Sequence, residues 1–237
     1  MLKPSYLINE KFDDVYFDVV NALDEAQHNF FSNNNLLSRI KNSIESNTPL
    51  IIGETGFGAG RVLVCLMEYI EKAGLKNVSI EYYSVELYPI SPEKMKYILN
   101  GLQENALNEQ VNESIETLLY VYKGIDISKS GWHIMPIKKS FGTITVNLWI
   151  GEALEMLTSL NKPCDVWFLD GHSPNKNPEM WRPELLMSIG QKTKKGGSCA
   201  TYTVAGSVRN ALKSAGFIIS KLPGCNGKKE VLQGIKG

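Results

Sequence analysis

An apolar stretch that runs through a glycine-rich turn into a helix is the feature that most limits how this chain can fold. The apolar stretch is TPLIIGE (48–54), the turn is GETGFGAGR (53–61), and RVLVCLMEYIEKAG (61–74) has helical periodicity and ends on a glycine. A strand that passes directly into a helix in this way begins a strand–helix–strand unit. The sequence therefore predicts an α/β fold.

The rest of the chain repeats this alternation. Further strands are expected at 78–87, 143–149, 164–170, 198–203, 217–223 and 228–236. Helices are expected at 91–102, 112–123, from about 151, and at 183–197 and 208–216. This order is typical of a mainly parallel sheet that carries helices on both faces.

The segment before the first strand is expected to pack on the sheet as an extension. Residues 24–44 are predicted to be helical with an asparagine-rich break. A chain of 237 residues with 43% hydrophobic content is long enough for one large core. We therefore expect an N-terminal extension over 1–47 and a domain over 48–237, which together form one structural unit.

Composition excludes several classes of protein. No apolar stretch approaches membrane-spanning length, and the first residues, MLKPSYLINEKFDD, lack the features of a signal or transit peptide. The four cysteines lie far apart, and the three histidines have no metal-ligand spacing. We therefore expect a cytoplasmic protein with reduced thiols, no membrane contact and no bound metal.

The formal net charge of zero is the sum of two regions of opposite sign. Residues 1–170 hold 14 Lys and Arg against 22 Asp and Glu, whereas residues 171–237 hold 11 against three, so the net charges are −8 and +8. The basic segment begins directly after Asp170. Either surface lysines are simply uneven along the chain, or this segment forms a face that binds a polyanion.

The spacing within the glycine-rich turn bears on which ligand it binds. Glycines at 56, 58 and 60 let the backbone approach a ligand closely, with the N–H groups of the helix start turned toward it. A dinucleotide site uses G-x-G-x-x-G, but the sixth position counted from Gly56 is Arg61. The pattern found is E-x-G-x-G-x-G, with Glu54 at the strand end. A carboxylate there repels a pyrophosphate and suits an ammonium and a sulfonium, which favours S-adenosylmethionine over a dinucleotide; a turn that binds nothing is the other alternative.

Two further carboxylates follow strands. Glu86 ends the second strand, where an acid accepts hydrogen bonds from the vicinal hydroxyls of a ribose. Glu152 follows the strand at 143–149. It either holds the amino group of an adenine or is a first-turn charge that the helix dipole stabilises.

The segment FLDGHSPNKNPEMWRPEL (168–185) places Asp170 at the end of the fourth strand, where ligands gather in open α/β sheets. Two X-Pro pairs, at 173–174 and 177–178, restrict the following loop and preorganise its side chains. Methyl transfer from a sulfonium needs in-line positioning of the nucleophile, and an amine nucleophile must also lose a proton. Asp170 is the carboxylate expected to meet that second need.

Several blocks, taken in order, resemble the methyltransferase domain of the bacterial bifunctional tRNA 5-methylaminomethyl-2-thiouridine biosynthesis enzyme. They are DVYFDVV with DEAQHNFFSNNNLLSRI (14–40), GETGFGAG (53–60), SVELYPIS (84–91), VNLWIGEALEML (146–157), FLDGHSPNKNPEMW (168–181), TYTVAGSVRNALKSAGF (201–217) and GKKEVLQG (227–234). The resemblance implies a class I S-adenosylmethionine-dependent methyltransferase, which is Rossmann-like, with a mostly parallel seven-stranded sheet and helices on both faces. It also implies methylation of the amine of 5-aminomethyl-2-thiouridine at the wobble position, with the tRNA anticodon region as the partner.

The resemblance also implies roles for single residues. Asp170 is the catalytic carboxylate that orients or deprotonates the amine. The residues implied around the S-adenosylmethionine cofactor are Glu54, Gly56, Phe57, Gly58, Gly60, Glu86, Glu152 and Asp170. Those implied to face the substrate are Lys176, Asn177, Pro178, Trp181, Arg209, Lys228 and Lys229. Trp181 or Tyr202 either stacks on an anticodon base or packs in the core, and a tRNA substrate favours the polyanion-binding interpretation of the basic segment.

The chain also departs from the family pattern. His172 stands where the family has an apolar residue, and is either a solvated loop residue or a catalytic group; Gly227-Lys228-Lys229-Glu230 replaces a run richer in Arg, whose bidentate phosphate contact Lys cannot make. The flavin-dependent oxidase domain of the family does not follow Gly237, so we expect methyl transfer alone, with a separate oxidase or aminomethyl-forming enzyme as a partner. Two alternatives remain open: an N-methyltransferase of the same fold that acts on a small-molecule amine, and a non-catalytic tRNA-binding module.

Overall fold

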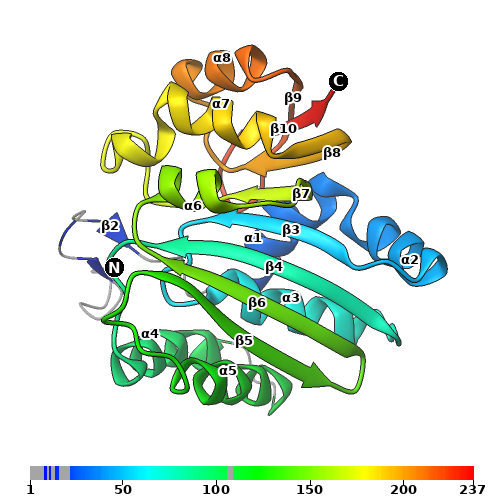
Figure 1. Ribbon diagram of the computed structural model, residues 1–237, viewed down its shortest axis with the longest axis vertical. Helices are drawn as coiled ribbons and strands as arrows, with labels where there is room; N and C mark the ends of the chain where they lie inside the picture. Colours follow the sequence, from blue (N-terminus) through cyan, green and yellow to red (C-terminus); the bar gives the residue numbers. More distant parts are fainter. Residues whose placement is uncertain (1–7, 10, 12–13, 16–21, 106–108) are drawn as a thin grey trace.

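The computed structural model describes residues 8–9, 11, 14–15, 22–105 and 109–237 of the chain. Within these residues, an eight-stranded sheet runs through the molecule and helices cover both of its faces (Figure 1). In spatial order the strands are β5 (Gly131–Lys139), β6 (Gly142–Ile150), β4 (Val78–Glu86), β3 (Leu50–Thr55), β7 (Cys164–Leu169), β8 (Thr193–Thr201), β10 (Glu230–Lys236) and β9 (Phe217–Pro223). The neighbours from β6 to β8 are parallel, whereas β5 pairs antiparallel with β6, and β10 pairs antiparallel with β8 and β9. A separate antiparallel pair joins β1 (Ile8–Asn9) to β2 (Asp14–Val15).

Two hydrophobic clusters lie on opposite faces of the sheet. On one face are α1 (Ala22–Ala26), α2 (Leu36–Ser46), α3 (Arg61–Lys72), α4 (Pro92–Asn105) and α5 (Glu109–Tyr122), and on the other are α6 (Ala153–Ser159), α7 (Pro183–Gln191) and α8 (Gly206–Ser214). Successive residues of β7 serve both faces, because Phe168 belongs to the first cluster and Trp167 and Leu169 belong to the second. A strand buried on both faces reads as a continuous apolar run, which is what VWFL shows.

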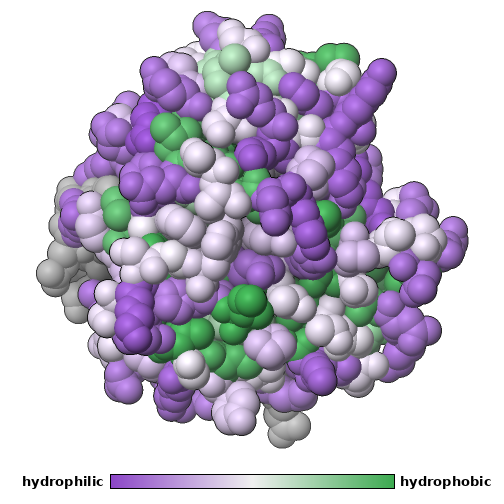
Figure 2. Space-filling view, in the orientation of Figure 1, coloured by the Kyte–Doolittle hydropathy of each residue, from purple (hydrophilic) through white to green (hydrophobic). Residues whose placement is uncertain are grey.

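The seven strands predicted from the sequence are all present, and β5 is an eighth. Pro136 lies within β5, and because proline is rare in strands, strand propensity does not predict β5. The proline is tolerated there because β5 is at the edge of the sheet and pairs only with β6. On the face shown in Figure 2, hydrophilic side chains predominate, and the hydrophobic ones gather in the lower half over β5 and β6.

One predicted helix ends earlier than expected. The helix placed at 183–197 stops at Gln191, and Thr193 already pairs with Cys164 at the start of β8. The pairing then shifts register before Val166 meets Ser198. This bulge lets the polar residues TKKGG belong to the strand although they do not alternate as strand residues usually do. The helix predicted across them was therefore wrong.

The segment ahead of β3 is helical with the predicted break. A π-helix (Gln27–Phe31) and a 3-10 helix (Ser32–Asn34) link α1 to α2, and Asn35 ends the break in a left-handed conformation with φ of 50°. Phe30 and Phe31 each lie 5.6 Å, between ring centroids, from Phe168. Residues 22–46 therefore contribute to the core of the sheet, while the boundary at 47/48 stays a prediction.

The order of the strands reverses between β3 and β7. From β3 the chain crosses to β4 on one side, and after β6 it returns to β7 on the other side of β3. Ligands of open α/β sheets bind beyond the carboxyl ends of the strands at such a reversal. Thr55 and Leu169 are paired at these two ends, so the glycine-rich turn and Asp170 follow neighbouring strand ends. Among the described residues, no helix has both the length and the apolar character to span a membrane.

Candidate active site

A cavity of about 650 Å³ opens at the carboxyl ends of β3, β4, β7 and β8. Its wall comes from the glycine-rich turn, the residues after β4 and β6, the loop after β7, and Tyr202 after β8. Lys11, Glu25 of α1, Asn29 and Phe30 of the π-helix that follows α1, and the turn between β9 and β10 also contribute to the lining. This volume is in the usual range for sites that enclose a small molecule.

Gly56, Phe57, Gly58 and Ala59 of the glycine-rich turn form the floor of this cavity. Gly56, Gly58 and Gly60 have positive φ values of 89°, 56° and 74°, which residues with a Cβ rarely adopt. A Cβ at Gly56 would lie 3.4 Å from the backbone oxygen of Asp170, and a Cβ at Gly60 would lie 2.5 Å from Leu118 Cδ2. Glycine is therefore required for the backbone conformation at all three positions and, at Gly60, also for the close packing of the turn against α5.

Glu86 lies against the turn at the end of β4. Its carboxylate accepts hydrogen bonds from the backbone N–H groups of Gly58 and Tyr88, both at 2.8 Å. Burial, which disfavours the charged form, outweighs these bonds and raises the pKa of Glu86 above its usual range. Each oxygen of a carboxylate can accept a second hydrogen bond, so Glu86 can still bind hydroxyl groups of a ligand in the cavity.

Asp170 lines the same cavity one residue beyond β7. Its Oδ1 accepts the N–H of Gly171 at 2.9 Å, and its Oδ2 lies 3.2 Å from Nη2 of Arg61. Thr55 donates to its backbone oxygen at 2.8 Å. The side chain is 20% exposed, so the carboxylate is fixed on one side and accessible from the cavity on the other.

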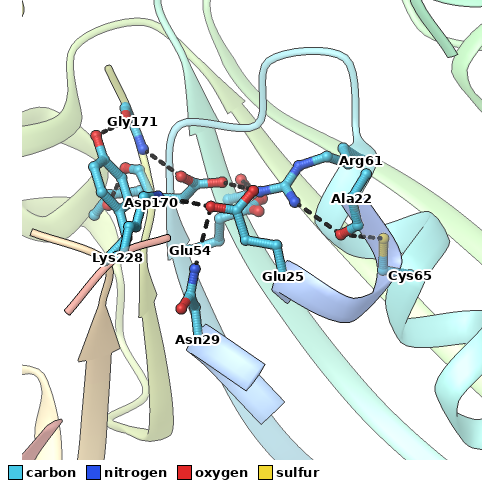
Figure 3. A network of polar contacts seen from close by, with 12 residues as sticks. Ala22, Glu25, Asn29, Glu54, Arg61, Cys65, Asp170, Gly171 and Lys228 are labelled. Carbon is cyan, nitrogen blue, oxygen red and sulfur yellow. Dashed lines mark hydrogen bonds and ion pairs between the residues drawn. The ribbon is translucent and has the colours of Figure 1, made fainter. Parts of the chain in front are cut away.

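Arg61 is the first residue of α3 and is almost fully buried. Its Nη1 donates to the backbone oxygen of Ala22 at 3.2 Å, so the guanidinium joins α1 to Asp170 (Figure 3). Burial lowers the pKa of Arg61, but the charge of Asp170 opposes this and the net shift is upward. In the sequence, Arg61 stands out only as the residue that breaks a dinucleotide motif.

A second ion pair crosses the cavity close by. Lys228 Nζ, from the turn between β9 and β10, lies 2.7 Å from Oε1 of Glu25 on α1. Asn29 Nδ2 contacts the same oxygen at 3.5 Å, and the Lys228 ammonium lies 4.6 Å from the ring centroid of Tyr202. Figure 3 shows Glu25 and Asp170 on the same side of Arg61, with Lys228 beyond them. Four segments distant in the sequence, which carry Glu25, Arg61, Asp170 and Lys228, thus meet around one set of charges.

The loop after β7 is held through its backbone. Trp181 Nε1 donates to the oxygen of His172 at 2.8 Å, and the Tyr202 hydroxyl donates to the oxygen of Gly171 at 2.6 Å. The backbone N–H groups of Lys176 and Asn177 both donate to the oxygen of Ser173, at 2.8 and 2.9 Å. These bonds account for the rigidity that the two X-Pro pairs predict.

Glu152 serves the helix that it precedes. It is the N-cap of α6, and its Oε2 accepts the N–H of Leu154 at 2.7 Å and of Glu155 at 3.3 Å. Its Oε1 lies 2.5 Å from Nη2 of Arg182. Partial burial raises the pKa of Glu152, but the hydrogen bonds from Arg182, Leu154 and Glu155 and the charge of Arg182 together outweigh it, and the pKa falls below its usual range. Glu152 therefore lies at the start of α6, as the alternative of a helix charge has it, but in the N-cap position, while a contact with an adenine stays a prediction.

Glu54 lies beneath the glycine-rich turn and not in the cavity. It is 1% exposed, and Ser84 donates to its Oε2 at 2.6 Å. Burial, only partly offset by that hydrogen bond, raises the pKa of Glu54 to about 8. The side chain therefore supports the turn from below.

Ten of the predicted site residues line the cavity: Gly56, Phe57, Gly58, Glu86, Glu152, Asp170, Lys176, Asn177, Pro178 and Lys228. Five do not: Glu54, Gly60, Trp181, Arg209 and Lys229. Sequence reasoning missed Glu25, Asn29, Arg61, Tyr88 and Arg182, which line it.

The five outliers have plain physical reasons. Glu54 is buried at the end of β3, and Gly60 lies at the start of α3, where it faces Leu118 and Phe57. Trp181 is 5% exposed because its ring packs in the core with Tyr202 at its edge. Arg209 lies on α8, which packs against α7, and Lys229 is exposed beyond Lys228. Trp181 thus packs in the core, as one of its two alternatives has it, whereas Tyr202 and His172 both line the cavity.

The basic segment is divided between two ends of the sheet. Lys176, Arg182 and Lys228 line the cavity. Lys192 and Lys194 instead flank the start of β8, at the opposite end, where they bind Leu160 O at 2.5 Å and Asp165 at 2.8 Å. The segment is thus not one continuous basic face. In the described part of the chain, no three His, Cys, Asp or Glu residues are grouped as metal ligands would be.

Comparisons with known proteins agree with this geometry. Residues 113–237, just over half of the chain, match the sequence profile of a family described as S-adenosyl-L-methionine-dependent methyltransferase. The chain is 34% identical over 228 residues to "tRNA 5-methylaminomethyl-2-thiouridine biosynthesis bifunctional protein MnmC" of Pseudomonas entomophila (strain L48), covering 96% of this chain and 33% of that protein. It is 36% identical over 223 residues to the protein of the same name from Pseudomonas savastanoi pv. phaseolicola (strain 1448A / Race 6), covering 94% and 32%. The chain thus spans about a third of the length of these curated relatives.

Among solved structures, the crystal structure of MNMC2 from Aquifex aeolicus superposes with a TM-score of 0.71 at 21% identity, over 96% of this chain and 65% of that one. This likeness concerns the fold. The expected methyltransferase fold and the expected S-adenosylmethionine cofactor are confirmed. The family match includes Asp170, the loop after β7 and the whole of β8, and the chain belongs to the S-adenosyl-L-methionine-dependent methyltransferases.

Proposed function

We propose that this protein transfers a methyl group from S-adenosyl-L-methionine to the amine of 5-aminomethyl-2-thiouridine at the wobble position of tRNA. The observation that carries the proposal is the position of Asp170, whose partly exposed carboxylate shares one cavity with the glycine-rich turn. The tRNA substrate is supported by the names of the two relatives, which describe biosynthesis of 5-methylaminomethyl-2-thiouridine in tRNA. The final step to that nucleoside is methylation of an amine.

The residues on the floor of the cavity fit the cofactor. A bare glycine turn leaves room for a nucleoside close to the backbone, and Glu86 offers the acceptor that a ribose diol requires. We assign cofactor contacts to Gly56, Phe57, Gly58 and Glu86. Glu152 and Glu54 support the walls of this site, because their oxygens are occupied by α6, Arg182 and Ser84. When bound, S-adenosyl-L-methionine supplies an electrophilic methyl carbon.

Asp170 is proposed to hold and deprotonate the acceptor amine. The nitrogen forms a bond to the methyl carbon as the carbon–sulfur bond breaks, and that electron pair stays on sulfur. The methylated nitrogen then carries one proton too many, and the carboxylate accepts it and passes it to solvent at the cavity mouth. In-line placement of the nitrogen accounts for most of what such a displacement requires.

The side chains on the substrate side suit a nucleotide of a polyanion. Lys176, Arg182 and Lys228 bring positive charge to the cavity, and Asn177 brings an amide. Tyr202 is the aromatic residue that we assign to the unstacked base, because it lines the cavity and Trp181 does not. The reaction needs a uridine that already bears an aminomethyl group, so an amine-forming reaction must precede it, and the cytoplasm is the compartment we assign to both.

The direct test uses purified protein, labelled S-adenosyl-L-methionine and tRNA that carries 5-aminomethyl-2-thiouridine. Nucleoside mass spectrometry is expected to show a gain of one methyl group on that nucleoside. The free nucleoside serves as the second substrate and is expected to react far more slowly. Equal rates on the nucleoside would favour a small-molecule N-methyltransferase, and cofactor binding without transfer would favour a non-catalytic module.

A Glu86→Gln variant is expected to bind S-adenosyl-L-methionine about 10- to 100-fold more weakly, since it loses a carboxylate acceptor for the ribose and turns the NH2 of its amide toward one of the two backbone N–H groups that the carboxylate accepts. Isothermal titration measures the dissociation constant. Glu93→Gln, in the exposed first turn of α4, is the matched control and should bind as the wild type does. An unchanged constant for Glu86→Gln would remove this residue from the cofactor site.

A further inference from the structure

The Asp170 carboxylate, which we assign to the acceptor amine, is held by α3 as well as by the loop after β7. Its Oδ2 lies 3.2 Å from the Arg61 guanidinium, which projects from the first turn of α3, and that side chain is 10% exposed. Burying a guanidinium is costly unless it is paired and hydrogen-bonded, and Arg61 is bound to both Asp170 and Ala22 O. A buried ion pair is a weak source of stability, so its presence in this cavity calls for another explanation.

We propose that Arg61 is a positioning residue for methyl transfer, which fixes the Asp170 carboxylate and balances its charge so that the acceptor amine is bound in its neutral, nucleophilic form. This inference rests on the proposed function, since it requires an amine at Asp170. Arg61 is not proposed to contact the amine, because it acts through Asp170.

The orientation of Asp170 follows from two donors that approach different oxygens. Gly171 N–H binds Oδ1 at 2.9 Å and Arg61 binds Oδ2 at 3.2 Å, which leaves rotation about χ2 little freedom. The remaining lone pairs are available to an N–H group in the cavity. Such a fixed acceptor directs the nitrogen lone pair along one line, as an in-line displacement requires.

The charge balance follows from the groups that face the amine position from each element. Asp170 after β7 is paired with Arg61 of α3, and Glu25 of α1 is paired with Lys228 of the β9–β10 turn. A third pair joins Glu152 to Arg182 at the wall of the cavity. The other titratable groups in the lining are Lys11, Glu86, Tyr88, His172, Lys176, Glu179 and Tyr202, and Glu54 lies beneath the turn.

Pairing of Asp170 with Arg61 has a chemical consequence for the substrate. A carboxylate without its counter-ion attracts an ammonium and raises the pKa of the bound amine. An ammonium has no lone pair and cannot attack the methyl carbon. Because Arg61 cancels the charge of Asp170, the carboxylate can accept a hydrogen bond from the amine without stabilising its protonated form.

The experiment compares single-turnover methylation across pH in wild type, Arg61→Gln and Arg61→Lys, with cofactor and tRNA saturating. The wild-type rate is expected to rise with pH as the bound amine loses its proton. In Arg61→Gln the midpoint of this rise should move up by about one pH unit, with a rate about tenfold lower below the midpoint. Arg61→Lys, which keeps the charge and loses the planar fork, should keep the wild-type midpoint at a reduced plateau rate.

Arg39→Gln is the matched control, because Arg39 also donates to backbone oxygens, those of Asn34 and Gly196, but lies outside the cavity lining. It should leave midpoint and plateau unchanged. A folded Arg61→Gln that binds cofactor and keeps the wild-type midpoint would overturn the inference. If Arg61→Gln does not fold, Lys228→Gln removes another positive charge from the cavity lining and is measured in its place. An upward shift of its midpoint supports the inference, and an unchanged midpoint overturns it. Failure of the wild type to methylate the amine would instead reject the proposed function.

Discussion

Replacing Asp170 by Asn is expected to lower the single-turnover rate of methyl transfer by about 10³-fold while S-adenosyl-L-methionine still binds. The amide keeps the size of the side chain but cannot accept the proton of the attacking amine, and loss of a positioned base typically costs 10²- to 10⁴-fold. The glycine-rich turn and Glu86 are untouched, so the dissociation constant for the cofactor should change by less than about threefold. Rapid-quench methylation and isothermal titration measure the two quantities separately.

Asp165→Asn provides the matched control for this variant. Asp165 is a carboxylate on the same strand, β7, but it lies near the opposite end and binds the N–H of Ile51 at 2.9 Å and Lys194 at 2.8 Å. The control should methylate at nearly the wild-type rate. Because Asp170→Asn leaves the buried Arg61 without its carboxylate partner, we also expect this variant to be less stable than the wild type. The methylation rates of the two proteins must therefore be compared at a temperature well below the melting temperature of each. A rate within tenfold of the wild type would remove Asp170 from the chemistry.

Replacing Glu54 by Gln is expected to remove a stability loss that the wild type suffers at neutral and alkaline pH. The folded state raises the pKa of Glu54 from 4.5 to about 8, chiefly through burial. Between these values the folded protein holds a proton that the unfolded chain has released, so the free energy of unfolding falls as pH rises. The slope is about 1.4 kcal/mol per pH unit, and the total across this window is about 3 to 5 kcal/mol.

Urea unfolding at pH 5 and pH 8 measures this effect as a difference between proteins. The amide of the Glu54→Gln variant carries no titrating proton, so the variant should lose less stability than the wild type between the two pH values, and should be the more stable of the two at pH 8. Glu45→Gln, on the exposed side of α2, should retain the wild-type difference. Equal pH dependence in Glu54→Gln and the wild type would show that Glu54 ionises in the folded state as it does in the unfolded chain.

The fold was largely predictable because its signals are local. The turn at 53–61 and the apolar run VWFL each show their pattern within a few residues. The strand predicted ahead of the turn, β3, and the strand predicted at this run, β7, are both present. The errors occur where tertiary context overrides local preference. Pro136 lies in an edge strand that a proline normally argues against, and the polar stretch TKKGG becomes part of β8 through a bulge.

The site was predictable only in part, for a different physical reason. Asp170 and Glu86 end strands, so their location at one edge of the sheet follows from strand order. Glu25, Arg61 and Lys228 belong to segments far apart in the chain that meet only after the helices pack on the sheet. One signal was available for Arg61: it opens a helix whose first eight residues are all buried, where an arginine requires a partner.

The two bonds that anchor the loop after β7 grip its main-chain oxygens and not its side chains. Both bonds accept at main-chain oxygens of the loop, so they do not depend on which side chains stand at 172, 176 and 179. Substitutions at these positions would leave the two bonds in place. Under the proposed function, related chains can therefore differ in the loop residues that contact the nucleotide while the position of Asp170 stays the same.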